Sequence, residues 1–244
     1  MPQRQTLQIW RQAKADDYKT LQETLSVFGD ADYLAFNRRI IPDLDRAFGV
    51  RMPVLRRILQ ALKKNPHAQE LWEALCLGET FEERMLAGML LPELHPDFTQ
   101  TYDRIRRFLP MIDNWAVCDT TAGALKGWTQ QHQERLWEQL PVLVRSTNKW
   151  ERRFGVVLLL HFQTPGYLKK AENLIAFLQN EREYYVQMGV AWVMSYYFFI
   201  APDVVTDWLR HFPHDDIVNL TIRKVGESHR GSAELRMGVK KYKR

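Results

Sequence analysis

Apolar residues recur at three- and four-residue intervals through nearly the whole chain. Clear examples are PVLRRILQALKK (53–64), FEERMLAGMLL (81–91) and RRFGVVLLLHF (152–162). This spacing gathers the apolar side chains on one face of an α-helix, whereas no segment shows the strict alternation typical of a strand. We therefore predict an all-α fold. Short connectors and a loose repeat of about 40 residues favour an α-solenoid of HEAT-like antiparallel helix pairs, with a compact helical bundle as the alternative.

Prolines and composition changes indicate how the chain is divided. Pro53, Pro141 and Pro202 each precede an apolar run, which predicts the first turn of a helix, where the missing N–H is not needed. No Gly- or Ser-rich linker separates the segments, so we predict one domain over residues 1–244. The last few residues, KKYKR, are expected to be disordered.

Several functional classes lack sequence support. The longest apolar run, at 186–201, is too short to span a bilayer, and the N-terminal residues do not resemble a signal peptide, so a cytoplasmic protein without membrane contact is expected. Two cysteines, Cys76 and Cys118, form no CxxC pair. His211 and His214 are three residues apart without an evident third ligand. We therefore expect no metal and no cofactor.

Positive charge is concentrated in two regions. Residues 223–244 carry eight basic side chains and two acidic ones, whereas the net charge of the whole chain is +5. A second cluster, rich in arginine, lies at 38–57. Arginine clusters favour a phosphate-bearing partner, and a solvated surface with a flexible tail is the alternative interpretation.

The segment DNWAVCD (113–119) contains the first candidate site. Asp113 or Asn114 is a plausible N-cap, after which Trp115 and Asp119 lie one turn apart on the same helix face. Burying an unpaired carboxylate is costly, so Asp119 either has a partner or lines a hydrated site. A capping or salt-bridged carboxylate is the alternative. The adjacent Cys118 has no nearby histidine in sequence that would activate it as a nucleophile.

Two later segments add further candidates. In NKWERRFGVV (148–157), Trp150 and Arg153 share a helix face, and Arg152 and Arg153 directly precede an apolar run, so at least one of them must lie at the edge of the core. In YYVQMGVAWVMSYY (184–197), Trp192 lies in the most hydrophobic segment. Ordinary core packing is the alternative for Trp192.

These segments, in this order in an all-helical chain, resemble the AlkD-like DNA alkylation repair family, whose founding members are HEAT-like repeat DNA glycosylases. The resemblance extends from FGVRMPVLRRI (48–58) to PDVVTDWL (202–209). Three short family patterns are matched by Trp115 with Asp119, Trp150 with Arg153, and Gln187 with Ala191 and Trp192.

The resemblance implies hydrolysis of the N-glycosidic bond of purines alkylated at N3 or N7. Such bases are cationic and leave without a general acid, so Asp119 alone would stabilise the charge on the deoxyribose and hold the attacking water. Trp115 and Trp192 would present aromatic faces to the cationic nucleotide. The expected partner is double-stranded DNA bound by a monomer on a concave basic face. The residues expected to contact the DNA backbone are Arg153, Arg152, Arg51, Arg56, Arg57 and Lys224.

One segment departs from the family pattern. Active members press a short N-terminal helix on the DNA at the lesion, and here the corresponding stretch is YLAFNRRIIPDLDRAFGV (33–50), built around Arg-Ile-Ile-Pro. Two alternatives to a glycosylase therefore stay open. One is a non-catalytic relative that recognises damaged or unusual DNA. The other is a helical scaffold for another protein, with the tryptophans as packing residues.

Overall fold

The computed structural model describes residues 2–41 and 43–244. Within these ranges the chain forms sixteen α-helices and five short 3₁₀ turns, and no strand. The all-α class predicted from the apolar periodicity is confirmed. Pro42, the last residue of the Arg-Ile-Ile-Pro stretch, lies outside the described ranges.

The chain divides into two compact units, residues 1–128 and 129–244, and the division falls within α9. The single domain predicted for residues 1–244 stays a prediction. The helices up to the division are α1 (Pro2–Gln12), α2 (Tyr18–Val27), α3 (Ala31–Ile40), α4 (Met52–Leu62), α5 (Ala68–Cys76), α6 (Phe81–Leu90), α7 (Phe98–Phe108), α8 (Trp115–Ala124) and α9 (Lys126–Gln131). Those that follow are α10 (Gln133–Val144), α11 (Lys149–Leu158), α12 (Pro165–Ala176), α13 (Tyr184–Phe198), α14 (Pro202–His211), α15 (Asp215–Glu227) and α16 (Ala233–Gly238).

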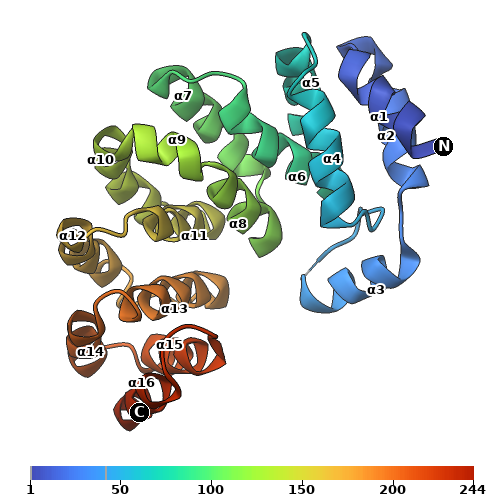
Figure 1. Cartoon of the computed structure of the whole chain (residues 1–244). Helices are drawn as coiled ribbons and strands as arrows, with labels where there is room; N and C mark the ends of the chain where they lie inside the picture. The colour runs from blue at the N-terminus through green and yellow to red at the C-terminus, as the bar shows by residue number, and fades with distance from the viewer. Residues whose placement is uncertain (1, 42) are drawn as a thin grey trace. The chain divides into compact units, whose positions relative to one another are not determined.

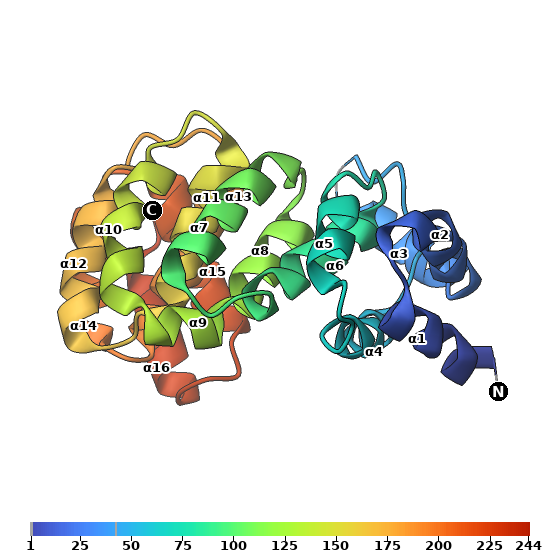
Figure 2. The same cartoon turned by 90° about the horizontal axis from the view of Figure 1, so that it is seen from above.

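The second unit is a stack of antiparallel helix pairs in two layers. Helices α11, α13 and α15 lie next to one another in one layer, and α10, α12 and α14 lie along the other side (Figures 1 and 2). The core between the layers is apolar, with Phe154, Phe162 and Tyr197 fully or almost fully buried. The Tyr197 hydroxyl donates to the carbonyl oxygens of Leu159 and Phe162, at 2.7 and 3.0 Å, so this buried polar group has partners.

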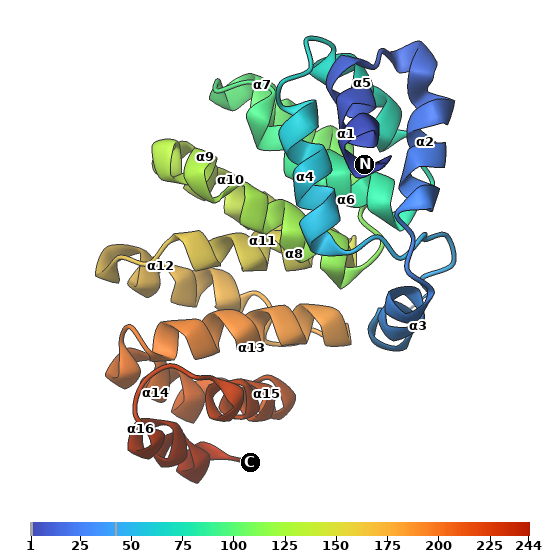
Figure 3. The ribbon, with the colours of Figure 1, turned by 45° about the vertical axis from the view of Figure 1, so that its right-hand side comes forward.

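In the first unit, α4, α6 and α8 follow one another in the same way (Figure 3). The buried carboxylate of Glu82 on α6 fixes the chain that leads into α4. It accepts the backbone N–H groups of Phe48, Gly49 and Val50, at 2.8–3.0 Å. Gly49 has a φ of +79°, a conformation that glycine adopts without strain. The loop before α4 is thereby held by a side chain that sequence reading would assign to a solvated helix face.

A close approach of α6 and α8 at Gly88 gives a testable prediction. A Cβ atom added to Gly88 would lie 2.0 Å from the Thr121 hydroxyl oxygen on α8. We expect Gly88→Ala to lower the free energy of unfolding by about 1–3 kcal/mol, because overpacking forces the helices apart. The measurement is denaturant unfolding.

Two further variants test the cause of that loss. Adding Thr121→Ala to Gly88→Ala should recover part of the lost stability, since it removes the clashing oxygen. Gly123→Ala is the matched control on α8, because no atom lies within 4 Å of its added Cβ. It should be neutral or stabilise by about 0.5–1 kcal/mol. Equal losses for Gly88→Ala and Gly123→Ala would contradict the close approach.

Two sequence expectations about chain ends and prolines need correction. Pro53 and Pro202 lie in the first turns of α4 and α14 as predicted, but Pro141 lies inside α10, so its prediction is wrong. The last residues, expected to be disordered, form a 3₁₀ turn (η5, Val239–Tyr242), and the Arg244 guanidinium donates to the carbonyl oxygens of Leu209, Arg210 and Phe212 at 2.7–2.9 Å.

Among the described helices, none is both long and apolar enough to cross a membrane.

Candidate functional site

Helix α8 holds the first candidate residues in a fixed position. Asn114 is the N-cap, and its side-chain oxygen accepts the backbone N–H groups of Ala116 and Val117, both at 3.0 Å. This settles the choice that the sequence left open between Asp113 and Asn114. Asp113 instead accepts hydrogen bonds from the Asn114 amide, at 2.8 Å, and from Arg84 of α6. The cap is thus tied to the neighbouring helix, and the first turn of α8 is anchored at its start.

Trp115 and Asp119 are both half-buried, one turn apart on α8. The Trp115 indole N–H donates to the carbonyl oxygen of Ile40, at 2.9 Å, at the C-terminal end of α3. Val117, Cys118 and Thr121 are buried on the other side of the helix, which is the side that contacts α6. The shared face predicted for Trp115 and Asp119 is therefore the less buried face of α8. Cys118, at 0% exposure, is enclosed within the fold.

Helix α3 occupies the first part, residues 33–40, of the segment that departs from the family pattern. Asp30 caps it by accepting the backbone N–H of Tyr33 at 2.9 Å. Phe36 and Ile40 are 45% and 42% exposed. Arg38 and Arg39 on its last turn are also exposed. The helix thus presents apolar and cationic side chains together, and its end is bound by Trp115.

The basic residues predicted in the first unit differ in their surroundings. Arg51 forms an ion pair with Asp30 at 2.8 Å and lies over the Tyr33 ring at 5.0 Å. The hydrogen bond from the Tyr33 backbone N–H, together with the hydrogen bond and the charge of Arg51, lowers the pKa of the Asp30 carboxyl. Arg56 is exposed, and no hydrogen bond or ion pair links it to another residue in the described ranges. Arg57 is exposed as well.

A groove of about 660 Å³ runs between α4 and α8. Arg56 and Arg57 contribute its α4 side, and Thr120, Gly123 and Ala124 contribute its α8 side. Gly123 has open space where a side chain would be. Thr120, which lines the groove, directly follows Asp119 in the sequence, and the two cations Arg56 and Arg57 lie on the opposite wall.

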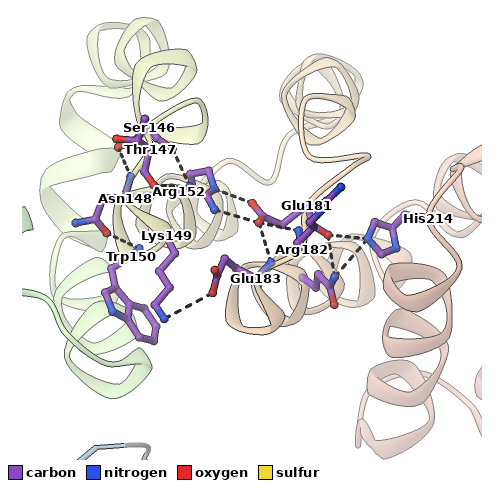
Figure 4. Close-up of polar contacts among 11 residues, drawn as sticks. Ser146, Thr147, Asn148, Lys149, Trp150, Arg152, Glu181, Arg182, Glu183 and His214 are labelled. Atoms are coloured by element: carbon purple, nitrogen blue, oxygen red, sulfur yellow. Dashed lines mark hydrogen bonds and ion pairs between the residues drawn. The ribbon is translucent and has the colours of Figure 1, made fainter.

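In the second unit, Arg152 makes internal contacts rather than facing solvent. Its guanidinium donates two hydrogen bonds to the Glu181 carboxylate, at 2.6 and 3.0 Å, and also reaches the carbonyl oxygens of Ser146 and Thr147 (Figure 4). The Glu181 carboxylate also accepts the backbone N–H groups of Arg182 and Glu183. These bonds bind the start of α11 to the turn before α13. All three nitrogens of the guanidinium take part in these hydrogen bonds, so the geometry favours an internal role for Arg152 over the DNA contact that the sequence predicts.

The Arg152–Glu181 pair gives a pH prediction. Burial acts to raise the pKa of the Glu181 carboxyl, but the hydrogen bonds from Arg152 and the backbone outweigh it, and the net shift is downward. A lowered pKa in the folded state stabilises the fold above the unfolded-state value of about 4.5, and this contribution is lost as the pH falls through the folded value. We expect Glu181→Gln to lower the free energy of unfolding by about 3 kcal/mol at pH 7, and by progressively less below pH 4.5.

Glu183→Gln is the control for that experiment. Its carboxylate pairs with Lys149 at 3.6 Å, and both side chains are nearly half exposed, so its loss should have a much smaller effect. Denaturant unfolding between pH 3 and 7 measures both variants. Parallel curves for Glu181→Gln and the unchanged protein would contradict the assignment.

Arg153 and Trp192 complete the predicted set. Arg153 is 5% exposed and donates to the carbonyl oxygen of Tyr185 in the first turn of α13, while its aliphatic stem lies 3.5 Å from the position of a Cβ added to Gly189. Trp192 is half-buried, and no residue in the described ranges stacks on its ring or accepts its indole N–H. Core packing therefore covers only part of the Trp192 side chain, and the rest of it is exposed. Lys224, in the last turn of α15, is half-buried with no ion pair to a described residue.

The two histidines considered for a metal site have other contacts. His214 Nε2 lies 2.8 Å from the Glu181 carbonyl oxygen and 3.3 Å from the Gln187 amide, and His211 contacts Asp207. In the described part of the chain, no group of three or more histidine, cysteine or acidic side chains is placed to hold a metal ion.

Comparison with known proteins adds one finding. A search of curated proteins finds no match to the chain. The family model described as DNA alkylation repair enzyme matches residues 21–226, which include every residue singled out above on α3, α4, α8, α11, α13 and α15. The resemblance noted from the sequence is confirmed, and the chain belongs to the DNA alkylation repair enzyme family, with DNA as the partner that this role implies.

Proposed function

We propose that the chain is a DNA glycosylase that hydrolyses the N-glycosidic bond of purines alkylated at N3 or N7 in double-stranded DNA. The observation that carries the proposal is the placement of Asp119 beside Trp115 on the less buried face of a capped and anchored helix, in a member of this family. A carboxylate at a partly buried position interacts with a developing charge more strongly than it would in bulk water.

The proposed reaction needs one carboxylate. An N3- or N7-alkylated purine carries a positive charge that is neutralised when its bond to C1′ breaks, so the bonding electrons leave with a neutral base. Positive charge then develops on the deoxyribose. Asp119 stabilises that charge and orients a water molecule, whose oxygen forms the new bond to C1′ as its proton is released. No general acid is required for the leaving group, unlike in enzymes that cleave ordinary glycosides.

The groove between α4 and α8 supports a path for one DNA strand in the first unit. Arg56 and Arg57 supply positive charge for phosphate oxygens, and the bare backbone at Gly123 permits close approach. Arg51 is a weaker candidate, since its charge is already offset by Asp30. The exposed Phe36 and Ile40 on α3 offer an apolar contact to the DNA next to Trp115.

For the second unit we propose Trp192 as an aromatic contact to the cationic nucleotide and Lys224 as a phosphate contact. Arg153 is better suited to a positioning role than to the phosphate clamp expected from the sequence, because the residue is 5% exposed and its guanidinium holds the first turn of α13. Arg152 is not among the residues that we propose for DNA contact.

One observation favours a second candidate, a DNA-binding relative without catalysis. Helix α3 combines exposed apolar residues with Arg38 and Arg39, which would bind DNA whether or not a base is released. Both candidates predict DNA affinity that falls steeply with salt. Only the glycosylase releases a base.

The experiment that separates them uses duplex DNA treated with a methylating agent. The purified chain is incubated with this DNA, and free 3-methyladenine and 7-methylguanine are measured by chromatography. We expect release well above the spontaneous rate. Salt-sensitive binding without release would establish the non-catalytic candidate, and absence of binding at moderate salt would contradict both.

A further inference from the structure

A second groove lies at the C-terminal end of the second unit and has no part in the proposed chemistry. Its volume is about 980 Å³, and its lining residues come from α13, α15, α16 and the C-terminal segment that contains η5. Leu220, Ile222 and Met237 give it an apolar lining, and Tyr184 borders it. Met237 is 64% exposed and Tyr184 51%, so two large side chains face solvent here without cover. An exposed apolar groove of this size is typical of a ligand or peptide site.

The rim of the groove is basic. Arg223, Arg236, Lys240 and Lys243 border it. Arg236 is held in place by hydrogen bonds from its guanidinium to the carbonyl oxygens of Arg230 and Gly231, at 3.0 and 2.7 Å. Within the described ranges, Lys240 and Lys243 have no carboxylate partner. The rim therefore has positive charge available for an anionic group.

The walls of the groove are fixed before any ligand binds. Ser232 caps α16 by accepting the backbone N–H of Leu235 at 3.1 Å. Beyond η5, the Arg244 backbone N–H donates to the Asn219 side chain at 3.0 Å, and its carbonyl accepts from the same amide at 2.8 Å. The segment that carries Lys240 and Lys243 is thus pinned to α15, which lowers the ordering cost of binding.

We propose that this groove binds an acidic peptide segment of a partner protein, with an apolar side chain in the lining and its carboxylates at Lys240, Lys243 and Arg236. Two carboxylates, Asp216 and Glu227, also border the groove, and Glu227 pairs with the rim residue Arg223 at 3.7 Å. A peptide can donate a backbone N–H group to Asp216, whereas a DNA backbone presents only acceptors. The aliphatic lining likewise suits a Leu, Ile or Phe side chain better than a stacked base, since only one aromatic residue, Tyr184, borders the groove.

The test uses fluorescence anisotropy with the full chain and labelled probes. The first probe is the peptide Asp-Asp-Glu-Leu-Phe, the second replaces Leu-Phe by Ser-Ser, and the third is a ten-nucleotide oligothymidylate. We expect the first peptide to bind saturably and the second to bind with an affinity at least about tenfold lower. The oligonucleotide should not compete with the first peptide for the groove.

Charge variants complete the experiment. The double variant Lys240→Glu, Lys243→Glu should lower the affinity for the first peptide at least about tenfold, because it reverses both lysine charges on the rim. Lys169→Glu, an exposed lysine on α12 in the same unit, is the matched control and should bind as the unchanged chain does. Equal binding of the two peptides, no binding of the first up to about 1 mM, or an unaffected double variant would overturn the proposal. Oligonucleotide binding that is lost with the two lysines would assign the groove to DNA instead.

Discussion

Replacing Asp119 by Asn should reduce release of methylated purine to the spontaneous rate while sparing DNA binding. A charge about 4 Å from a carboxylate gains about 4 kcal/mol at an effective dielectric constant of 20, which corresponds to about a thousandfold in rate. The amide keeps the shape of the carboxylate but not its charge. We therefore expect single-turnover release to fall by about 10²- to 10³-fold, measured with saturating enzyme on methylated duplex DNA.

The control for this variant is Asp103→Asn in the same unit. Asp103 is exposed on α7 and makes no side-chain hydrogen bond or ion pair with another described residue, so the variant makes the same change of charge away from the proposed site. It should release base at the rate of the unchanged chain. Full activity of Asp119→Asn would rule out the proposed role. Loss of both activity and DNA affinity would instead indicate that Asp119 supports the fold of α8.

Trp192→Ala should lower the release rate without a large loss of stability. A cation–π contact is worth about 0.5–2 kcal/mol, so removing it should slow release by about 2- to 30-fold if the contact strengthens in the transition state. Trp192→Phe keeps an aromatic ring with a weaker cation–π attraction, so its release rate should lie between those of the unchanged chain and Trp192→Ala. Since no described ring packs against Trp192, its removal should cost less stability than removal of a core tryptophan.

Trp208→Ala serves as the comparison for stability. Trp208 is 5% exposed and its ring lies 6.3 Å from that of the buried Tyr197, so it is part of the packed interior of the second unit. We expect Trp208→Ala to lower the free energy of unfolding by about 3–5 kcal/mol. If Trp192→Ala destabilises the chain as strongly and leaves release unchanged, Trp192 is a packing residue.

Local sequence signals predicted much of the fold and part of the site. The three- and four-residue apolar spacing identified the helices, and the residue pair Asp113-Asn114 placed the start of α8 to within one position. Pro141 was misjudged because the amphipathic segment ERLWEQL before it already forms a helix, and packing of Leu136 and Leu140 outweighs the lost hydrogen bond.

The remaining features depend on residues far apart in sequence. Trp115 and Ile40 are 75 positions apart, and Arg152 and Glu181 are 29 apart, so no local pattern could pair them. The charge pattern of NKWERRF is compatible with a phosphate contact or an internal ion pair, and only the position of Glu181 separates these possibilities for Arg152. The basic rim of the C-terminal groove was visible as a charged cluster, but its apolar lining requires α15 and α16 to lie side by side.

The most direct test of the central claim compares a charged lesion with an uncharged analogue of the same shape. Single-turnover release would be measured on duplexes that contain either N3-methyladenine or its 3-deaza analogue, which lacks the positive charge. A single carboxylate without a general acid predicts rapid, Asp119-dependent release of 3-methyladenine and binding of the analogue without cleavage. Release of the analogue at a comparable rate would contradict this mechanism, because it would require a proton donor that the proposed site does not include.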